Sequence, residues 1–109
     1  MSGDVWKDPG RYYNRAGEPI TFERWVLLLE HRGYQRLAFD EVDGYDVSTV
    51  WLGLDHGFGY SAGPLIFESM VFGPDGDDCE QRRYATEEAA HAGHAELVEQ
   101  VRLLVAATT

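Results

Sequence analysis

The stretch Leu37–Leu52, LAFDEVDGYDVSTVWL, decides the fold. Asp43 and Gly44 are a strong signal for a two-residue hairpin turn, because both positions of that turn need a positive φ that these residues tolerate. With this turn Val42 pairs with Tyr45, and a slip of one residue would divide the apolar side chains between two faces. The pattern predicts one apolar face with Leu37, Phe39, Val50, Leu52 and Leu54, and an opposite face with Tyr34, Arg36, Thr49, Trp51 and Gly53.

Helices are predicted on both sides of this hairpin. The first follows its N-cap Thr21 and ends at Gly33, with His31 and Arg32 in its last turn. The second follows its N-cap Thr86. Apolar residues repeat at helical spacing in both segments. They are Phe22, Trp25, Val26 and Leu29 in the first helix, and Ala90, Leu97, Val101, Leu104 and Val105 in the second.

Further strands complete the predicted sheet. Leu65–Phe72 is apolar on both faces apart from Glu68 and Ser69, as is typical of a central strand, and Gln81–Ala85 is a short edge strand. The fold class is therefore α+β, an antiparallel sheet of three to four strands with two long helices in the order helix, strands, helix. The sequence leaves open which face of the sheet the helices cover. If they cover the Leu52 face, Trp51 is on the free face, and if they cover the other face, Trp51 is a core residue. Residues 1–10 form a loose arm, and residues 11–109 form a single domain.

The composition excludes several classes of partner. The chain has 109 residues and a net charge of −10, and residues 37–81 hold ten Asp or Glu without any Lys or Arg. Such a surface repels phosphates, so no nucleic-acid partner is expected. No apolar run is long enough for a membrane span, and no secretory signal is expected. Cys79 is the single cysteine, which fits a reducing cytoplasm.

Several segments together resemble a group of small proteins of actinobacteria and their phages. These segments are Tyr12–Gly17 (YYNRAG), Ser48–His56 (STVWLGLDH), Pro64–Phe72 (PLIFESMVF) and Arg83–Ala89 (RYATEEA), the last leading to Gly93 and His94. The resemblance extends from Tyr12 to about Leu97. It implies a recurrent fold and a cytoplasmic setting in a bacterium or an infected one, and it brings no activity, cofactor or catalytic residue.

The candidate catalytic residues are Asp55, His56, Glu68 and His94. Asp55 and His56 end a strand and open a Gly-rich loop, where sites often form. Glu68 interrupts an apolar strand, so it must be paired, exposed at an interface, or have a raised pKa. The structural alternative, which we favour, is a Glu68–Arg36 pair with the guanidinium stacked on Trp51. The catalytic alternative is a general base beside the loop.

A metal site is the weaker interpretation of the histidines. Glu87, His91 and His94 stand at i, i+4 and i+7, so they share one side of the second helix and could bind a divalent metal. His94, however, also lies close to the apolar stripe, which favours a hydrogen-bonded structural histidine. We therefore expect neither a bound transition metal nor a cofactor.

The face away from the helices indicates the function. It carries the apolar side chains of Tyr34, Trp51, Ile66, Met70 and Phe72, and such a patch needs a partner. This predicts a non-enzymatic intracellular accessory protein that forms a homodimer or binds a host or phage protein. The predicted contact residues are Trp51, Arg36, Tyr34, Met70 and Phe72. The alternative is a small metal-dependent enzyme or small-molecule-binding domain that uses Asp55, His56 and His94. An acidic decoy for a nucleic-acid-binding protein ranks last.

Overall fold

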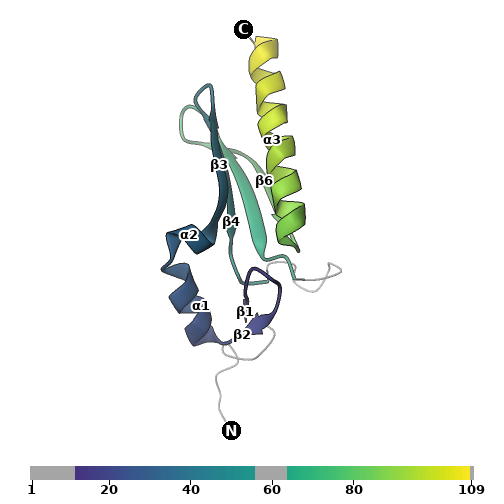
Figure 1. The fold of residues 1–109 in the computed structure, drawn as a ribbon. Helices are drawn as coiled ribbons and strands as arrows, with labels where there is room; N and C mark the ends of the chain where they lie inside the picture. Colours follow the sequence, from purple (N-terminus) through teal and green to yellow (C-terminus); the bar gives the residue numbers. More distant parts are fainter. Residues whose placement is uncertain (1–11, 56–63, 109) are drawn as a thin grey trace.

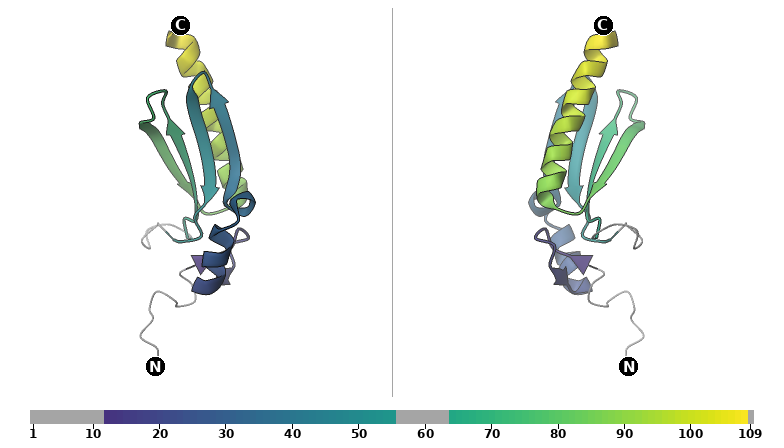
Figure 2. Two further views of the ribbon diagram at one scale, coloured as in Figure 1. Left: turned by 90° about the vertical axis from the view of Figure 1, so that its left-hand side faces the viewer. Right: turned by 90° about the vertical axis from the view of Figure 1, so that its right-hand side faces the viewer.

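A four-stranded antiparallel sheet in the order β3-β4-β5-β6 is the centre of the fold. A computed structural model describes residues 12–55 and 64–108, so the predicted arm, residues 1–10, lies outside the described residues. The strands are β3 (Arg36–Val42), β4 (Tyr45–Trp51), β5 (Phe67–Phe72) and β6 (Asp78–Tyr84). The long helix α3 (Glu87–Thr108) lies along one face of this sheet, and in the described residues nothing covers the other face (Figures 1 and 2). The predicted α+β class is therefore confirmed.

The elements that precede the sheet gather at one of its ends (Figure 1). They are β1 (Tyr12–Tyr13), β2 (Pro19–Ile20), α1 (Phe22–Leu29) and α2 (Arg32–Gln35). The two short strands pair with each other, and an antiparallel bridge joins Tyr12 to Leu54, just beyond the end of β4. The N-terminal elements thus gather at one end of the sheet, where they pack against the cluster around Trp51.

The predicted hairpin turn is confirmed. Asp43 has φ 48° and Gly44 has φ 87°, and Val42 pairs with Tyr45. The predicted register holds from Val42 back to Ala38, but a β-bulge follows, and Arg36 pairs with Val50 in place of Leu37. Because the bulge adds one residue to β3, Leu37 packs on the α3 side of the sheet, against the cluster around Trp51.

The face that α3 covers is the Trp51 face, so the condition on which the functional interpretation rested, cover of the Leu52 face, is not met. In β4 the side chains of Val47, Thr49 and Trp51 are fully buried, whereas Val50 is only half-buried. Residues of α3 pack against Val47 and not against Val50. The reason is the indole of Trp51, which buries far more apolar area than a valine and so determines the inward face of its strand.

The predicted helices are confirmed only in part. Thr21 caps α1, because its Oγ1 accepts a hydrogen bond from the Arg24 amide at 3.1 Å. The helix stops before Glu30, however, because His31 is extended and the separate short helix α2 follows. His31 and Arg32 are therefore not in its last turn, and Gly33 does not end it. With α1 only 8 residues long, α3 is the one long helix of residues 12–55 and 64–108, and it is the helix that lies along the sheet.

The described helices include none that is both long and apolar enough to cross a membrane. The predicted N-cap of α3 is confirmed, since Thr86 Oγ1 accepts a hydrogen bond from the Ala89 amide at 3.1 Å. Of the apolar stripe predicted for this helix, Ala90, Leu97 and Val101 are buried, whereas Leu104 is exposed. The stripe therefore meets the sheet along the first part of α3 and is open to solvent toward its end.

Trp51 joins the N-terminal elements to the sheet. Its Nε1 donates to the Tyr13 carbonyl at 2.9 Å, and the ring of Tyr34 meets it edge-on with centroids 5.0 Å apart. Gly53 has φ 70°, and a Cβ there would lie 2.3 Å from the Trp51 ring and 2.7 Å from the ring of Trp25. This close approach requires glycine both for its backbone angle and for space.

We expect Trp51→Ala to lower the free energy of unfolding by about 3 to 5 kcal/mol, because it empties a fully buried site and removes the bond to the Tyr13 carbonyl. Leu103→Ala is the matched control, since Leu103 is 62 % exposed on α3 and its loss should change the free energy by less than about 0.5 kcal/mol. Urea unfolding of both variants measures the difference. Equal stability of the two variants would contradict the assignment of Trp51 to the core.

Candidate functional site

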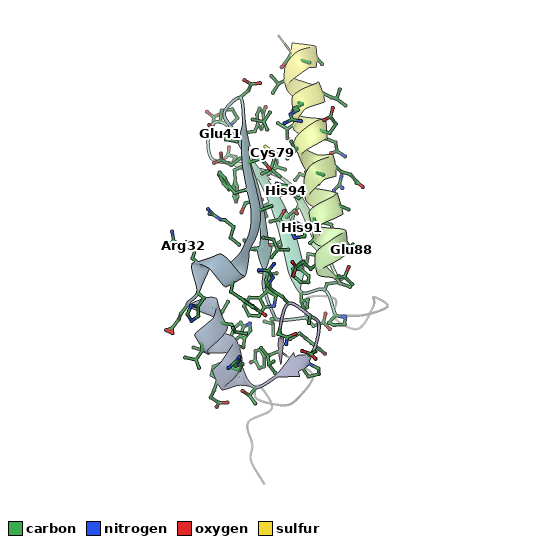
Figure 3. The ribbon with its side chains drawn as sticks, in the orientation of Figure 1. Arg32, Glu41, Cys79, Glu88, His91 and His94 are labelled. Carbon is green, nitrogen blue, oxygen red and sulfur yellow. The ribbon has the colours of Figure 1, made fainter. Side chains whose placement is uncertain are left out.

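A chain of polar side chains crosses the space between the sheet and α3. Asp40 Oδ2 lies 2.7 Å from His94 Nε2, and His94 Nδ1 lies 2.7 Å from Thr49 Oγ1. Thr49 Oγ1 in turn lies 2.5 Å from Ser69 Oγ. Figure 3 shows His94 on the side of α3 that faces the sheet. The four residues come from β3, α3, β4 and β5, so the chain connects three strands to the helix.

The carboxylate at one end of this hydrogen-bonded series sets which atoms donate and which accept. A carboxylate only accepts hydrogen bonds, so His94 Nε2 carries a proton toward Asp40. In the neutral imidazole Nδ1 then accepts from the Thr49 hydroxyl, and Thr49 accepts from Ser69. Within this series of four side chains, each polar atom described above therefore has a hydrogen-bond partner, as a buried polar group requires.

A carboxylate, a histidine and a hydroxyl in this order also occur in the catalytic triads of hydrolases. Here, however, the hydroxyl groups are too buried to reach a substrate. The side chain of Asp40 is 53 % exposed, whereas His94 is 5 % exposed and both Thr49 and Ser69 are 0 % exposed. A nucleophile must reach its substrate within a few ångströms. The hydroxyl end of this chain is sealed by the sheet and α3, so its geometry suits a structural role. The sequence-based interpretation of His94 as a hydrogen-bonded structural residue agrees with these contacts.

We expect Thr49→Val to destabilise the fold by about 1 to 3 kcal/mol, because it keeps the shape of the side chain while leaving His94 Nδ1 and Ser69 Oγ without their partner. The adjacent substitution Val50→Thr exchanges the same atoms on the solvent side of β4 and should cost less than about 0.5 kcal/mol. Thermal and urea unfolding at low protein concentration compare the two. A Thr49→Val protein as stable as the parent would show that the buried chain contributes nothing.

The described members of the predicted catalytic set, Asp55, Glu68 and His94, do not meet in one site. Asp55 Oδ1 accepts a hydrogen bond from the Leu65 amide at 2.9 Å, so this carboxylate fastens the two sides of the loop between them. His56 lies outside the described residues. Glu68 pairs with Arg83 at 3.2 Å and accepts a hydrogen bond from Gln81 at 2.5 Å, on the sheet face opposite His94. The described members of the set thus have separate, local partners.

The Glu–Arg pair predicted for Glu68 exists, but its arginine is different. Arg83 of β6 supplies the guanidinium, because β6 lies beside β5 and places these two residues directly across from each other. Arg36 instead lies over the ring of Phe39, with its guanidinium carbon 4.9 Å from the ring centroid. The predicted stacking of Arg36 on Trp51 is wrong, because the two residues lie on opposite faces of the sheet.

The residues of the weaker metal hypothesis are also divided. His91 lies 3.4 Å from Glu87 near the start of α3, whereas His94 faces Asp40 and Thr49. Within residues 12–55 and 64–108, no three His, Cys, Asp or Glu side chains are grouped so as to hold a metal ion. Besides His91, the described partner of Glu87 is an arginine, and His94 does not contact it.

This arginine is Arg15, which the sequence analysis did not single out. Its Nε and one terminal nitrogen donate to the two carboxylate oxygens of Glu87 at 2.9 and 2.6 Å. Its other terminal nitrogen donates to the Tyr34 carbonyl at 3.1 Å. The two-point hydrogen bond to Arg15 lowers the pKa of Glu87 and raises the pKa of Arg15. It fastens the β1–β2 hairpin to the start of α3.

Because the pKa of Glu87 is lowered in the fold, its contribution to stability is complete above the ordinary pKa of 4.5 and is lost as the pH falls through the lower folded value. We therefore expect Glu87→Gln to destabilise the protein at pH 6 and to lose that difference in acid below about pH 4. Glu88→Gln, which removes the same charge from the next, exposed position, is the control. Urea unfolding from pH 3 to 6 measures both. Parallel pH profiles for the two variants would contradict the role of the Arg15–Glu87 pair.

The described surface has two notable hollows. A groove of about 280 Å³ runs between α3 and the β5–β6 side of the sheet, and a second hollow of about 440 Å³ lies beside the start of α3. The second contains Arg15 and Glu87, which already satisfy each other. The groove is mainly apolar, with Tyr45, Val71, Leu97, Val101 and Leu104 beside Cys79, Glu80 and Gln100. Neither hollow includes the hydroxyls of Thr49 and Ser69.

The sheet face opposite α3, called the open face below, is the largest feature without a covering element in the described residues (Figure 2, left). Strand pairing arranges its side chains in three rows across the strands. In the middle row, Phe39 is 44 % exposed, and Met70, two strands away across Ser48, is half-buried. From the α1 end to the turn end, the rows are Arg36, Val50, Glu68 and Arg83; Phe39, Ser48, Met70 and Gln81; and Glu41, Asp46, Phe72 and Asp78.

The predicted partner-contact residues divide between the two sides of the sheet. Arg36, Met70 and Phe72 lie on the open face. Trp51 does not, because it is fully buried, and Tyr34 packs against Trp51 while its hydroxyl accepts the Arg15 amide. Trp51 is therefore a core residue, and Tyr34 is a half-buried residue that packs against it, so neither lies on the open face.

Comparison of the chain with protein-family models, with curated proteins and with solved structures found no match.

Proposed function

We propose that this chain is a non-enzymatic accessory protein of the cytoplasm that acts by binding protein through the open face of its sheet, and that it forms a homodimer. The proposal rests on one observation: in the described residues, a helix covers only one face of the four-stranded sheet. Helix α3 buries one face, while Phe39, Met70 and Phe72 stay partly in contact with water on the other. Burying such a surface against a second copy is favourable, and a twofold contact needs only one self-complementary patch.

The contacts of the candidate catalytic residues also support a binding role over an enzymatic one. The hydroxyls of Thr49 and Ser69 have no accessible surface, Asp55 is bonded to the Leu65 amide, and Glu68 is paired with Arg83 of the neighbouring strand β6. In the described residues, no nucleophile or base lies in either hollow with a hydrogen-bonded partner that would activate it. The apolar side chains of the open face, by contrast, are directly accessible.

The size of the open face predicts weak association. Strands lie about 4.8 Å apart and rise about 3.3 Å per residue, so four strands of six residues cover roughly 400 Å² on each copy. Stable complexes bury about 1,200 Å² or more in total. A contact of this size belongs to the weak, exchanging class, so the dimer is expected to form at tens of micromolar and above.

We expect the parent protein to approach twice the monomer mass of 12.3 kDa as its concentration is raised into the hundred-micromolar range, and Met70→Glu to remain monomeric. Met70 is in the middle row, where a buried charge without a partner opposes association. Leu103→Glu places the same charge on an exposed position of α3 and should leave association unchanged. Sedimentation velocity over a concentration series measures all three. A parent protein of constant 12.3 kDa mass would overturn the homodimer.

A further inference from the structure

We propose that the two copies stack open face against open face with reversed strand direction, so that Arg36 of each copy pairs with Glu41 of the other. This inference rests on the homodimer of the proposed function and specifies its geometry. The proposal rests on two charged rows at opposite ends of the open face. The arginine row holds Arg36 and Arg83, and the acidic row holds Glu41, Asp46 and Asp78.

The acidic row, which holds Glu41, Asp46 and Asp78, has no cationic partner among the residues that the structure describes. Glu41 and Asp46 stand directly across from each other on neighbouring strands, and like charges in that position destabilise a sheet. Asp78 adds a third carboxylate at the same end of the open face. In the described residues no arginine pairs with any of these three. This end of the face is therefore complementary to a positively charged surface.

The opposite row holds a cation that is available for such a contact. Arg36 is exposed at the edge strand β3 and lies over the Phe39 ring, and none of the described carboxylates pairs with it. Arg83 in the same row is partly neutralised by Glu68. Arg36 and Glu41 are five residues apart along β3, or about 16 Å at the rise of an extended strand. Phe39 lies between them.

The positions of these charges select one twofold arrangement. A twofold axis parallel to the strands would place each row over itself and bring Arg36 against Arg83 of the second copy. An axis that runs along the rows, across the strands, places the arginine row over the acidic row and keeps β3 over β3. Arg36 then faces Glu41 of the second copy twice, once at each end. The middle rows, with Phe39 and Met70, pack against each other between these two contacts.

The test uses two opposite charge reversals on β3, Arg36→Glu and Glu41→Arg. Each variant alone has like charges at both contacts of its homodimer, so its dissociation constant should rise by about tenfold or more. In an equimolar mixture, the heterodimer has opposite charges at both contacts and should form with nearly the parent affinity. Sedimentation velocity with one variant fluorescently labelled measures the mixed species, and circular dichroism verifies that each variant is folded.

The controls reverse the same charges away from the open face. Arg102→Glu and Glu88→Arg change exposed residues of α3, the helix that lies on the opposite face of the sheet (Figure 1). Alone or mixed, they should associate as the parent does. This separates the pairing of specific residues from the effect of net charge, because each control changes the net charge as its open-face counterpart does.

The outcomes distinguish the two proposals. A parent protein that stays monomeric overturns the homodimer itself. A parent dimer that neither reversal weakens leaves the homodimer standing and overturns this arrangement. Tighter association of Arg36→Glu alone also overturns it, because that result is expected if Arg36 faces Arg83 of the second copy. Weakening by each reversal and recovery in the mixture support the arrangement.

Discussion

The burial of Trp51 is the constraint on which the rest of the structure depends. Its indole donates to the Tyr13 carbonyl and packs under Tyr34, and Gly53 leaves room for it beside Trp25. Once this side chain is inside, alternation along β4 places Thr49 and Val47 inside as well. Helix α3 must then cover that face, and the N-terminal elements must close the end of the sheet around the indole.

The same alternation produces both of the polar features discussed above. Thr49 on the inner side needs a hydrogen-bonding partner, and His94 supplies it while Asp40 holds the far side of the imidazole. On the outer side, Val50 and its neighbours face solvent and form the open face. On the face that α3 covers, the sheet thus has a series of hydrogen-bonded side chains with buried hydroxyl groups. The other face is partly apolar, with arginines at one end and carboxylates at the other. The first stabilises the monomer, and the second is the surface for which we propose a partner.

The sequence left the covered face of the sheet undecided for two reasons. Apolar residues stand at both odd and even positions of β4 and β5, so periodicity alone does not choose between Trp51 and Val50 as the inward residue. The bulge before Ala38 then moves Leu37 to the Trp51 side, and no turn or proline signal in the sequence marks that bulge. Glu68 shows the same limit, because an Arg–Glu pair was predictable from its chemistry, whereas the choice of Arg83 over Arg36 required the strand order.

What the sequence by itself determined is local. The Asp43-Gly44 turn and the Thr21 and Thr86 caps depend on backbone angles and hydrogen bonds within a few residues, and each formed as predicted. Only the tertiary structure decided which sheet face α3 covers and that Asp40 meets His94 and Arg15 meets Glu87, contacts that span 54 and 72 residues. The physical reason is that such contacts depend on how strands are ordered and where a bulge shifts their register. Strand order and register depend on which complete face of the sheet buries more apolar area. Neighbouring residues in the sequence do not determine them.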